Sequence, residues 1–578
     1  MLAGPIFSRE ALTLPRQMRH FLIRSGYVAA LFVLIYTAGQ STFGWQQIRN
    51  LGDLSRFGSL VFQLFSVIQL SLVLFFSLLF AANNVAQEKD RQTLILLLMT
   101  DLRNRELVLG KLLASFLTVA VLLVATIPGF LMVRLLGGVG LDQIFWSLAI
   151  CGSAALAAGS WGTLVACWKE KTFQTLAISV LGLVLLIGIA EAGAGLAGAD
   201  SPAGFWLGRL NPYRALFAVL NPWQFSAGPG VVVVRPWESV VLMLGLAFVL
   251  NGISILRLRV WNPPRTVYET SRTAAQQEAA EKTRGKSRQV WSNPVIWREI
   301  RTRAYGRRVF VIKLAYLVLA GFAVLQLAGT GPADEQVLGM ISPAGFLFVG
   351  LSILSLVLIN AQAVTSLTSE RDGRTLELLL MTDVTAKEFV FGKLGGVLYN
   401  TLELLLVPLG LAVWYLVDGR ITGEILTYMI AGFLVLAVFS AMLGLHSGLS
   451  WESSRQAIAS SLGTMFFLFI GIIIFMMLLV EARSSFFLQF QSFVVFIGIG
   501  GIALYAVLSH RNPSPALMIA GGLLPFLTFY AITEFLLAGT LGVCLSIAVA
   551  YGFTTLAMLV PAISEFDVAL GRATLDRH

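Results

Sequence analysis

The most constraining feature of the chain is an internal repeat, which recurs without a gap at an offset of 282 positions. Residues 88–112 and 370–394 are identical at 15 of 25 positions. Leucines match one another easily in apolar sequences, so the shared polar residues carry the evidence. The matched polar pairs are Glu88/Glu370, Asp90/Asp372, Thr93/Thr375, Thr100/Thr382, Asp101/Asp383, Glu106/Glu388 and Lys111/Lys393. Self-similarity at one fixed offset predicts two structurally equivalent halves.

Long runs without any charged residue surround both copies. The chain is 57% hydrophobic and only 12% charged, against roughly 25% charged residues in soluble domains. Such runs fall at 25–48, 57–87, 112–133, 143–168, 172–190 and 239–256, and again at 314–333, 336–369, 425–451, 456–480, 484–510, 512–533 and 535–564, while 394–417 is interrupted only by Glu403. Each run can hold a helix of about 20 residues, the length that crosses a bilayer. We therefore expect an all-α, polytopic membrane protein of 12–14 spans.

The runs divide the chain into two repeats of six spans and a C-terminal hairpin. We expect a first repeat at 1–258, a basic cytoplasmic linker at 259–292, a second repeat at 293–510, and an extra hairpin and tail at 511–578. Each repeat begins with a short segment, 4–24 and 293–299, that shares an Arg-Glu pair and predicts an amphipathic interfacial helix. The loop 192–237, with its prolines and aromatic residues, predicts a re-entrant or surface-lying helix.

The distribution of basic residues indicates which side of the membrane each loop occupies. With the N-terminus inside and no cleavable signal peptide, only eight of the 41 Lys and Arg residues fall outside. Insertion favours this bias, and the topology rule accounts for the net charge of +10 without nucleic acid. We expect a multi-pass protein of the cell inner (plasma) membrane, with both repeat copies in the cytoplasm.

Each copy reads as an amphipathic helix–turn–helix between the second and third spans. Residues 94–98 and 376–380 are apolar enough to lie on the membrane surface, and we expect Glu88, Asp90, Glu370 and Asp372 to face the cytosol. Asp101 and Asp383 are candidate helix caps, and Thr385 with Glu388 fits a capping box. Lys111 and Lys393 are expected to anchor the third span at the interface. A second repeated cytoplasmic position is marked by Glu170 and Glu452.

Little in the chain predicts catalysis. Cys151, Cys167 and Cys544 lie in apolar runs and read as small core residues. The four histidines form no His-Glu-x-x-His motif, and Gly110-Lys111 and Gly392-Lys393 lack the remainder of a phosphate-binding loop. We therefore expect no catalytic residue, no metal site and no cofactor bound by this chain.

The repeated motif, with a Glu, a basic and an acidic residue, then Thr-Leu-Glu-x-Leu-Leu and a later Gly-Lys, resembles the cytoplasmic loop of ABC-2-type exporter permeases. The resemblance covers residues 1–510 and implies coupling helices within 88–106 and 370–388 that seat against a separate ATP-binding subunit, present in two copies, which holds the ATP and Mg²⁺. The implied coupling residues are Glu88, Asp90, Arg91, Thr93, Asp101, Glu106, Lys111, Glu370, Asp372, Arg374, Thr375, Glu377, Asp383, Glu388 and Lys393. The first copy departs from the family pattern at Gln92, where the family has Gly, and at Ile95, where the second copy keeps Glu377. These departures imply that the first copy binds its ATP-binding subunit more weakly than the second copy does.

Two other classes of function fit parts of the sequence. An ion-driven secondary transporter can also be built from parallel repeats, but it usually needs intramembrane acids, and Glu403 is the candidate. A membrane scaffold could use the same docking loops without moving cargo. The motif and its placement favour an ATP-driven exporter, and the uniformly apolar spans favour a hydrophobic or amphipathic cargo.

Overall fold

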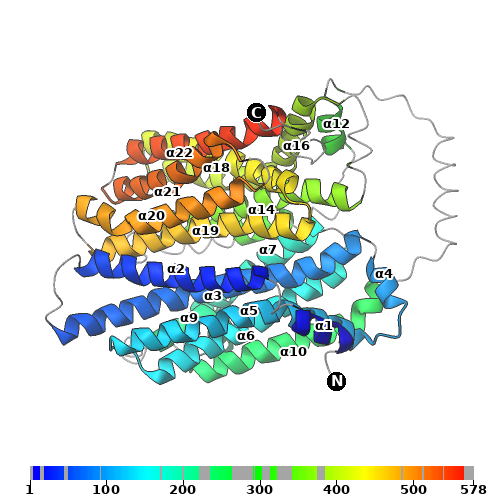
Figure 1. The fold of residues 1–578 in the computed structure, drawn as a ribbon, viewed down its shortest axis with the longest axis horizontal. Helices are drawn as coiled ribbons and strands as arrows, with labels where there is room; N and C mark the ends of the chain where they lie inside the picture. Colours follow the sequence, from blue (N-terminus) through cyan, green and yellow to red (C-terminus); the bar gives the residue numbers. More distant parts are fainter. Residues whose placement is uncertain are drawn as a thin grey trace.

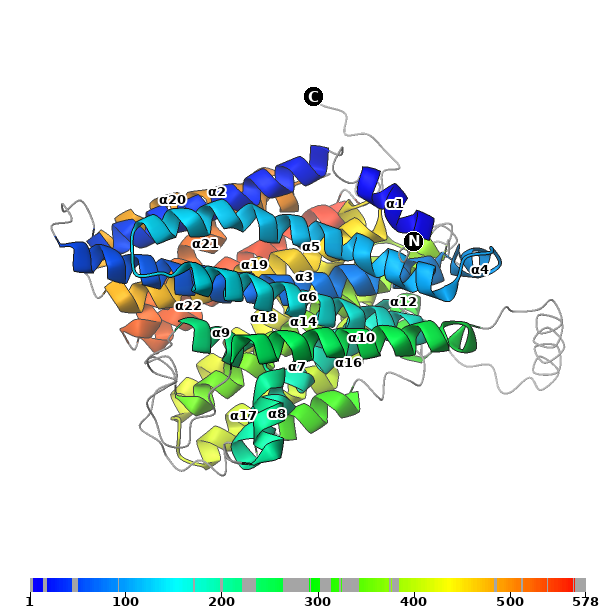
Figure 2. The ribbon, with the colours of Figure 1, turned by 90° about the horizontal axis from the view of Figure 1, so that it is seen from below.

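All regular structure in the described part of the chain is helical, and most helices lie roughly parallel to one another (Figure 1). The computed structural model describes residues 4–13, 18–43, 50–91, 93–169, 172–197, 201–220, 235–262, 291, 293–301, 313–321, 324, 342–373, 376, 384–482, 486–510, 513–537, 539–564 and 566. The helices α1, α4, α12 and the start of α16 lie at one end of the bundle, which we call the motif end (Figures 1 and 2).

The predicted spans of the first half are confirmed. Its helices are α1 (Gly4–Thr13), α2 (Met18–Phe43), α3 (Leu51–Asp90), α4 (Thr93–Leu98), α5 (Asn104–Leu135), α6 (Leu141–Trp168), α7 (Thr172–Ala197), α8 (Pro202–Leu210), α9 (Pro212–Leu220) and α10 (Pro236–Trp261). Six of them, α2, α3, α5, α6, α7 and α10, are long and apolar enough to cross a membrane. The short helix predicted over 4–24 is confined to α1, because residues 18–24 form the start of α2. The loop 192–237 contains the short helices α8 and α9.

The second half follows the same order with one broken span. Its helices are α12 (Pro294–Arg301), α14 (Pro343–Asp372), α16 (Ala386–Asn400), α17 (Leu402–Val417), α18 (Gly423–Ser450), α19 (Ser454–Ala482), α20 (Phe486–Leu508), α21 (Pro515–Leu536) and α22 (Thr540–Ser564). The span predicted at 394–417 is instead bent by 57° between α16 and α17. The span predicted at 314–333 and the linker at 259–292 lie mostly outside the described residues.

Matching helices of the two halves make matching contacts. The entry helix α1 packs on α5 as α12 packs on α16, and α3 packs on α6 as α14 packs on α18. Two glycines at the 282-residue offset show the same close approach. A Cβ atom on Gly162 would lie 2.7 Å from the carbonyl oxygen of Leu78, and one on Gly444 would lie 2.8 Å from that of Asn360. The offset read from the motif therefore extends to the packing of these two helix pairs.

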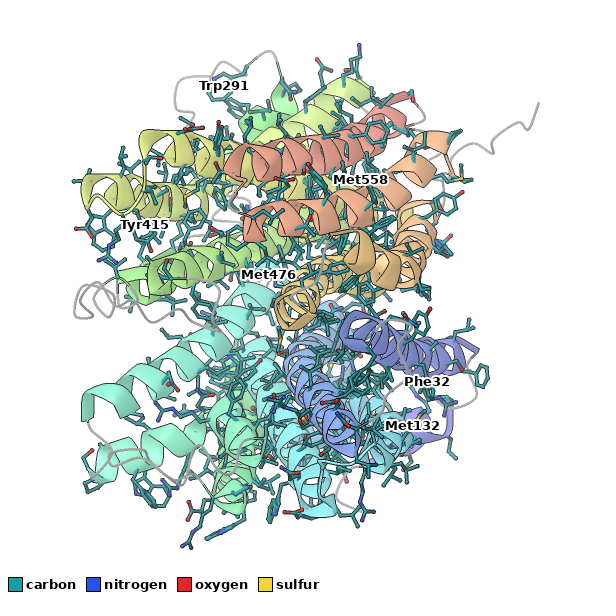
Figure 3. The ribbon with its side chains drawn as sticks, turned by 90° about the vertical axis from the view of Figure 1, so that its left-hand side faces the viewer. Phe32, Met132, Trp291, Tyr415, Met476 and Met558 are labelled. Carbon is teal, nitrogen blue, oxygen red and sulfur yellow. The ribbon has the colours of Figure 1, made fainter. Side chains whose placement is uncertain are left out.

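The two halves lie against each other in Figure 3, with Phe32 and Met132 in one half, Tyr415 and Met558 in the other, and Met476 near the boundary. Two crossed contacts join them: α3 packs on α19, and α14 packs on α7. At the first contact the rings of Phe75 and Phe466 stack with their centroids 4.7 Å apart. Apolar side chains therefore fill the boundary, and each second span meets the fifth span of the other half.

The packing of the last three helices differs from the predicted division at residue 510. Helix α22 packs along α18, as α10 packs along α6. Helix α21 packs on both α20 and α22, and α20 also packs on α2 of the first half. We infer that α22 is the sixth span of the second half and that α20 and α21 are the additional pair.

Candidate functional site

The first copy of the repeated motif forms a tight hairpin at the motif end. Helix α3 ends at Asp90, α4 spans Thr93–Leu98, and α5 begins at Asn104. Leu94 is buried in a cluster with Val85, Leu107 and Val108, which holds α4 against the ends of α3 and α5. Leu96 and Met99 are 64% and 74% exposed on the other side. The hairpin therefore presents an apolar exposed face on a fixed base, and α4 stands out from the bundle (Figures 1 and 2).

A buried ion pair closes the base of this hairpin. The Nζ atom of Lys111, on α5, lies 2.7 Å from Oε1 of Glu88, on α3. Lys111 is buried, and about two thirds of the Glu88 side chain is covered. Glu88 was expected to face the cytosol and Lys111 to anchor at the interface, and the structure shows in addition that the two bind each other. The two residues bind each other because a lysine on this buried face of α5 needs a counter-charge.

The second copy contains the same ion pair within a larger network. The Nζ atom of Lys393 lies 2.8 Å from Oε1 of Glu370 and 2.7 Å from Oε1 of Glu299. Arg298, beside Glu299 on α12, contacts both carboxylates. Lys393 and Glu299 are almost fully buried. As in the first copy, the predicted cytosolic glutamate and interfacial lysine bind each other.

The network keeps its buried acid ionised. Burial alone would raise the pKa of Glu299, but the charges of Lys393 and Arg298 and their hydrogen bonds outweigh it and hold the pKa below its ordinary value of 4.5. The carboxylate of Glu299 is therefore available to join the entry helix α12 to α16. Close packing supports the same contact, because a Cβ atom on Gly396 would lie 2.6 Å from Cβ of Glu299.

A basic residue beside each glutamate caps the end of the fourth span. Lys89 donates hydrogen bonds to the carbonyl oxygens of Cys167 at 2.6 Å and Lys169 at 3.0 Å. At the 282-residue offset, Arg371 donates to the carbonyl oxygens of Gly448, at 2.6 Å, and Trp451. Carbonyls at a helix C-terminus lack partners within the helix and attract cations. Each motif therefore joins the second, third and fourth spans of its half at one point.

One contact of the motif crosses between the halves. Arg91, which directly follows α3, pairs with Asp372, the last residue of α14. The position equivalent to Arg91 in the second copy is Gly373, so the pair has no symmetric mate. Both residues were predicted to contact a partner, whereas the structure brings them together.

The start of the third span differs in detail from the prediction. In the first copy the N-cap is Arg103 rather than Asp101, and Oε2 of Glu106 accepts a hydrogen bond from the Arg103 backbone at 3.1 Å. In the second copy the predicted capping box is confirmed, because Thr385 and Glu388 each accept a hydrogen bond from the backbone amide of the other, at 3.2 and 3.0 Å. Asp101 is exposed in the turn after α4.

Several predicted residues lie outside the description. Those not placed are the side chain of Asp90 and the residues Glu170, Arg374, Thr375, Glu377 and Asp383. Glu452, which together with Glu170 marks the second repeated cytoplasmic position, is exposed just after α18. Thr93 is exposed, and its hydroxyl donates a hydrogen bond to the Glu88 backbone at 3.3 Å.

The intramembrane acid Glu403 is also paired. It lies in the first turn of α17, directly after the bend at Thr401, and forms an ion pair with Lys313. Asn400, just before the bend, donates to the backbone of Glu299 at 3.4 Å. Glu403, the candidate acid for an ion-driven transporter, is thus bound to a lysine at the start of a helix.

Four residues of the site were absent from the predicted set: Lys89, Arg371, Arg298 and Glu299. Signals for all four were in the sequence. Positions 89 and 371 are both basic at the 282-residue offset, and the Arg-Glu pair of the entry segments recurs at 9–10 and 298–299. Neither signal revealed which atoms these side chains would meet.

Comparison with known proteins adds one finding. Residues 36–256 match the model of a family described as ABC-2 family transporter protein. The search of curated proteins and the search of solved structures found no match. The matched range begins within α2 and ends within α10, so it contains the first hairpin and its ion pair.

Proposed function

We propose that the chain is the permease of an ATP-driven exporter, because its residues 36–256 match the family described as ABC-2 family transporter protein. It is a multi-pass membrane protein, the membrane component of an ABC transporter, and its family implies partnership with ATP-binding subunits. In our proposal one chain contains two fused half-transporters, and its motif end faces the cytoplasm at the cell inner membrane.

The observation that carries the proposal is the shared construction of the two motifs. In both halves a glutamate on the second span binds a buried lysine on the third, and the adjacent basic residue binds the end of the fourth. A force applied to either motif would therefore reach three spans of that half directly. A loop that only connects two spans does not need such a base.

We assign contact with the ATP-binding subunits to the exposed side of each hairpin and not to its glutamates. In the first copy this side carries Leu96, Met99 and Asp101. Glu88 and Glu370, which were predicted to touch the partner, would act by positioning the hairpins. Two copies of the partner would hold ATP and Mg²⁺ and perform the hydrolysis, while this chain would catalyse no reaction.

Closure of the two partners on ATP would move the two hairpins relative to each other. Because each second span meets the fifth span of the other half, the α3–α19 and α14–α7 contacts are the surfaces that would slide. The apolar boundary between the halves would then open toward the outside, as in rigid-body alternating access.

The test measures ATPase activity in membranes that contain this chain and its ATP-binding partner. Met99→Glu is expected to lower transport-coupled hydrolysis at least tenfold, because a charge replaces an apolar docking contact. Leu135→Glu is the matched control, because Leu135 is also an exposed apolar residue and is the last residue of α5, away from the hairpin. Equal activities for the two variants would contradict the assignment, as would failure of any ATP-binding protein to co-purify with the chain.

A further inference from the structure

The first half contains an apolar cavity of about 150 Å³. It lies between α3, α6, α7 and α10, and Leu210 and Pro212, where α8 meets α9, form part of its wall. All fourteen lining residues are apolar, with Ala157, Trp161 and Met243 among them. The indole nitrogen of Trp161 donates a hydrogen bond to the carbonyl oxygen of Ser179 at 3.1 Å, so it needs no hydrogen-bond partner inside the cavity.

The second half lacks the small residues that make this space. At the 282-residue offset, the lining residues Ala154 and Ala157 correspond to Leu436 and Phe439. The ring of Phe439 packs edge-on against Tyr551 of α22, with centroids 5.0 Å apart. Since α22 takes the place of α10, an aromatic pair fills the position that Ala157 leaves open. At this place the second half therefore has two packed aromatic side chains where the first half has open space.

The wall holds its shape through one close contact. A Cβ atom on Gly182 would lie 2.4 Å from the ring of Trp161, so the indole can lie flat on α7 only because position 182 is glycine. The equivalent residue in the second half is Thr464. An unfilled cavity destabilises the protein around it, and an apolar cavity of this size excludes water but accepts apolar molecules.

The outer faces of the helices around the cavity indicate which apolar molecule is available to fill it. The helices that flank the cavity expose apolar side chains to the outside of the bundle, namely Val184 and Ile189 on α7 and Leu244 and Phe248 on α10. In a membrane-spanning bundle these faces meet lipid hydrocarbon. We propose that the cavity binds an acyl chain of a membrane lipid. This site goes beyond the proposed export function, because binding needs neither ATP nor a partner subunit.

The test uses the full chain alone, reconstituted in vesicles of phosphatidylcholine with brominated acyl chains, which quench tryptophan fluorescence on contact. The contribution of Trp161 is the difference between the protein and its Trp161→Phe variant. We expect bromination to quench this contribution. In the Ala157→Phe variant, which introduces the residue found in the second half, the quenching of Trp161 should fall at least threefold.

Two further variants separate cavity filling from general disturbance. Ala154→Leu, which also copies the second half, is expected to reduce the quenching in the same direction. Phe439→Ala changes the equivalent position of the other half and should leave the quenching of Trp161 unchanged. A Trp161 contribution that bromination does not quench in the parent, or that is quenched as strongly in the two filled variants as in the parent, would overturn the acyl-chain site. Neither result depends on ATPase coupling, so failure here is distinguishable from failure of the exporter proposal.

Discussion

The Nε atom of Arg91 lies 3.6 Å from Oδ1 of Asp372, and this ion pair joins the first motif to the second across the boundary of the two halves. Arg91 is 49% exposed, whereas the Asp372 side chain is 8% exposed. A half-exposed pair of this kind contributes little to stability, about 0–1 kcal/mol. Its position is more important than its strength, because any separation of the two motifs must break it.

The first prediction is that this pair restrains the distance between the motifs. Arg91→Ala should broaden the distribution of distances between spin labels at Thr100 and Glu452, measured by electron–electron resonance, with the melting temperature almost unchanged. Exchanging the charges, with Arg91→Asp and Asp372→Arg together, should narrow the distribution again. A distribution that is the same in the single variant and the parent would show that the pair restrains nothing.

The second prediction ranks the two buried lysines. Lys393→Ala removes one of the two cations that Glu299 and Glu370 share and leaves them with Arg298. Breaking a buried pair in this way costs about 3–5 kcal/mol. Lys111→Ala should cost less, because its partner Glu88 is about one third exposed and water can reach it. Thermal unfolding in detergent checks the order. A larger loss for Lys111→Ala than for Lys393→Ala would contradict the network that we describe.

The helical architecture could be predicted from the sequence because membrane spans are marked by the absence of charge over about 20 residues. The exceptions are local. The bend at Thr401, within the run 394–417, could not be predicted from the repeat. The equivalent span of the first half, α5, is a continuous helix. The assignment of α22 as the sixth span of the second half depends on its packing against α18. Hydropathy does not predict which helices pack together.

The site could be predicted only in part. A charged residue that recurs in both copies of the motif indicates that its side chain is needed, but it does not indicate which other side chain it contacts. Glu88 and Lys111 are 23 positions apart; Glu88 was predicted to face the cytosol and Lys111 to anchor the third span at the membrane interface. They meet because the hairpin through α4 turns α5 back along α3. In the second copy, Lys393 of α16 likewise meets Glu370 of α14. Glu299 reaches the same point from another segment, and that contact depends on the docking of α12 against α16.

The third prediction concerns the capped ends of α18 and α6. Arg371→Ala removes the charged donor from the carbonyl oxygens of Gly448 and Trp451, and hydrogen bonds to charged groups contribute about 1.5–3 kcal/mol. We expect faster amide hydrogen exchange in the segment that follows α18, with α6 unaffected. Lys89→Ala should show the reverse pattern, with faster exchange after α6 alone. Exchange rates that do not change at the end of the helix whose cap was removed would contradict the capping role.

The last prediction is a pH dependence that originates at Glu299. Its pKa is held below 4.5 in the folded chain, so its ionisation contributes stability that is complete above pH 4.5 and is lost as the pH falls through the folded-state value. The melting temperature of the parent should therefore drop in this acidic window. Glu299→Gln has no carboxylate to protonate, so it should be less stable at neutral pH and should show a smaller acidic drop. The reference is Glu452→Gln, which changes an exposed glutamate. On acidification, the melting temperature of Glu452→Gln should fall as much as that of the parent. If the melting temperature of Glu299→Gln fell by the same amount too, the network around Lys393 would not be the source of the pH dependence.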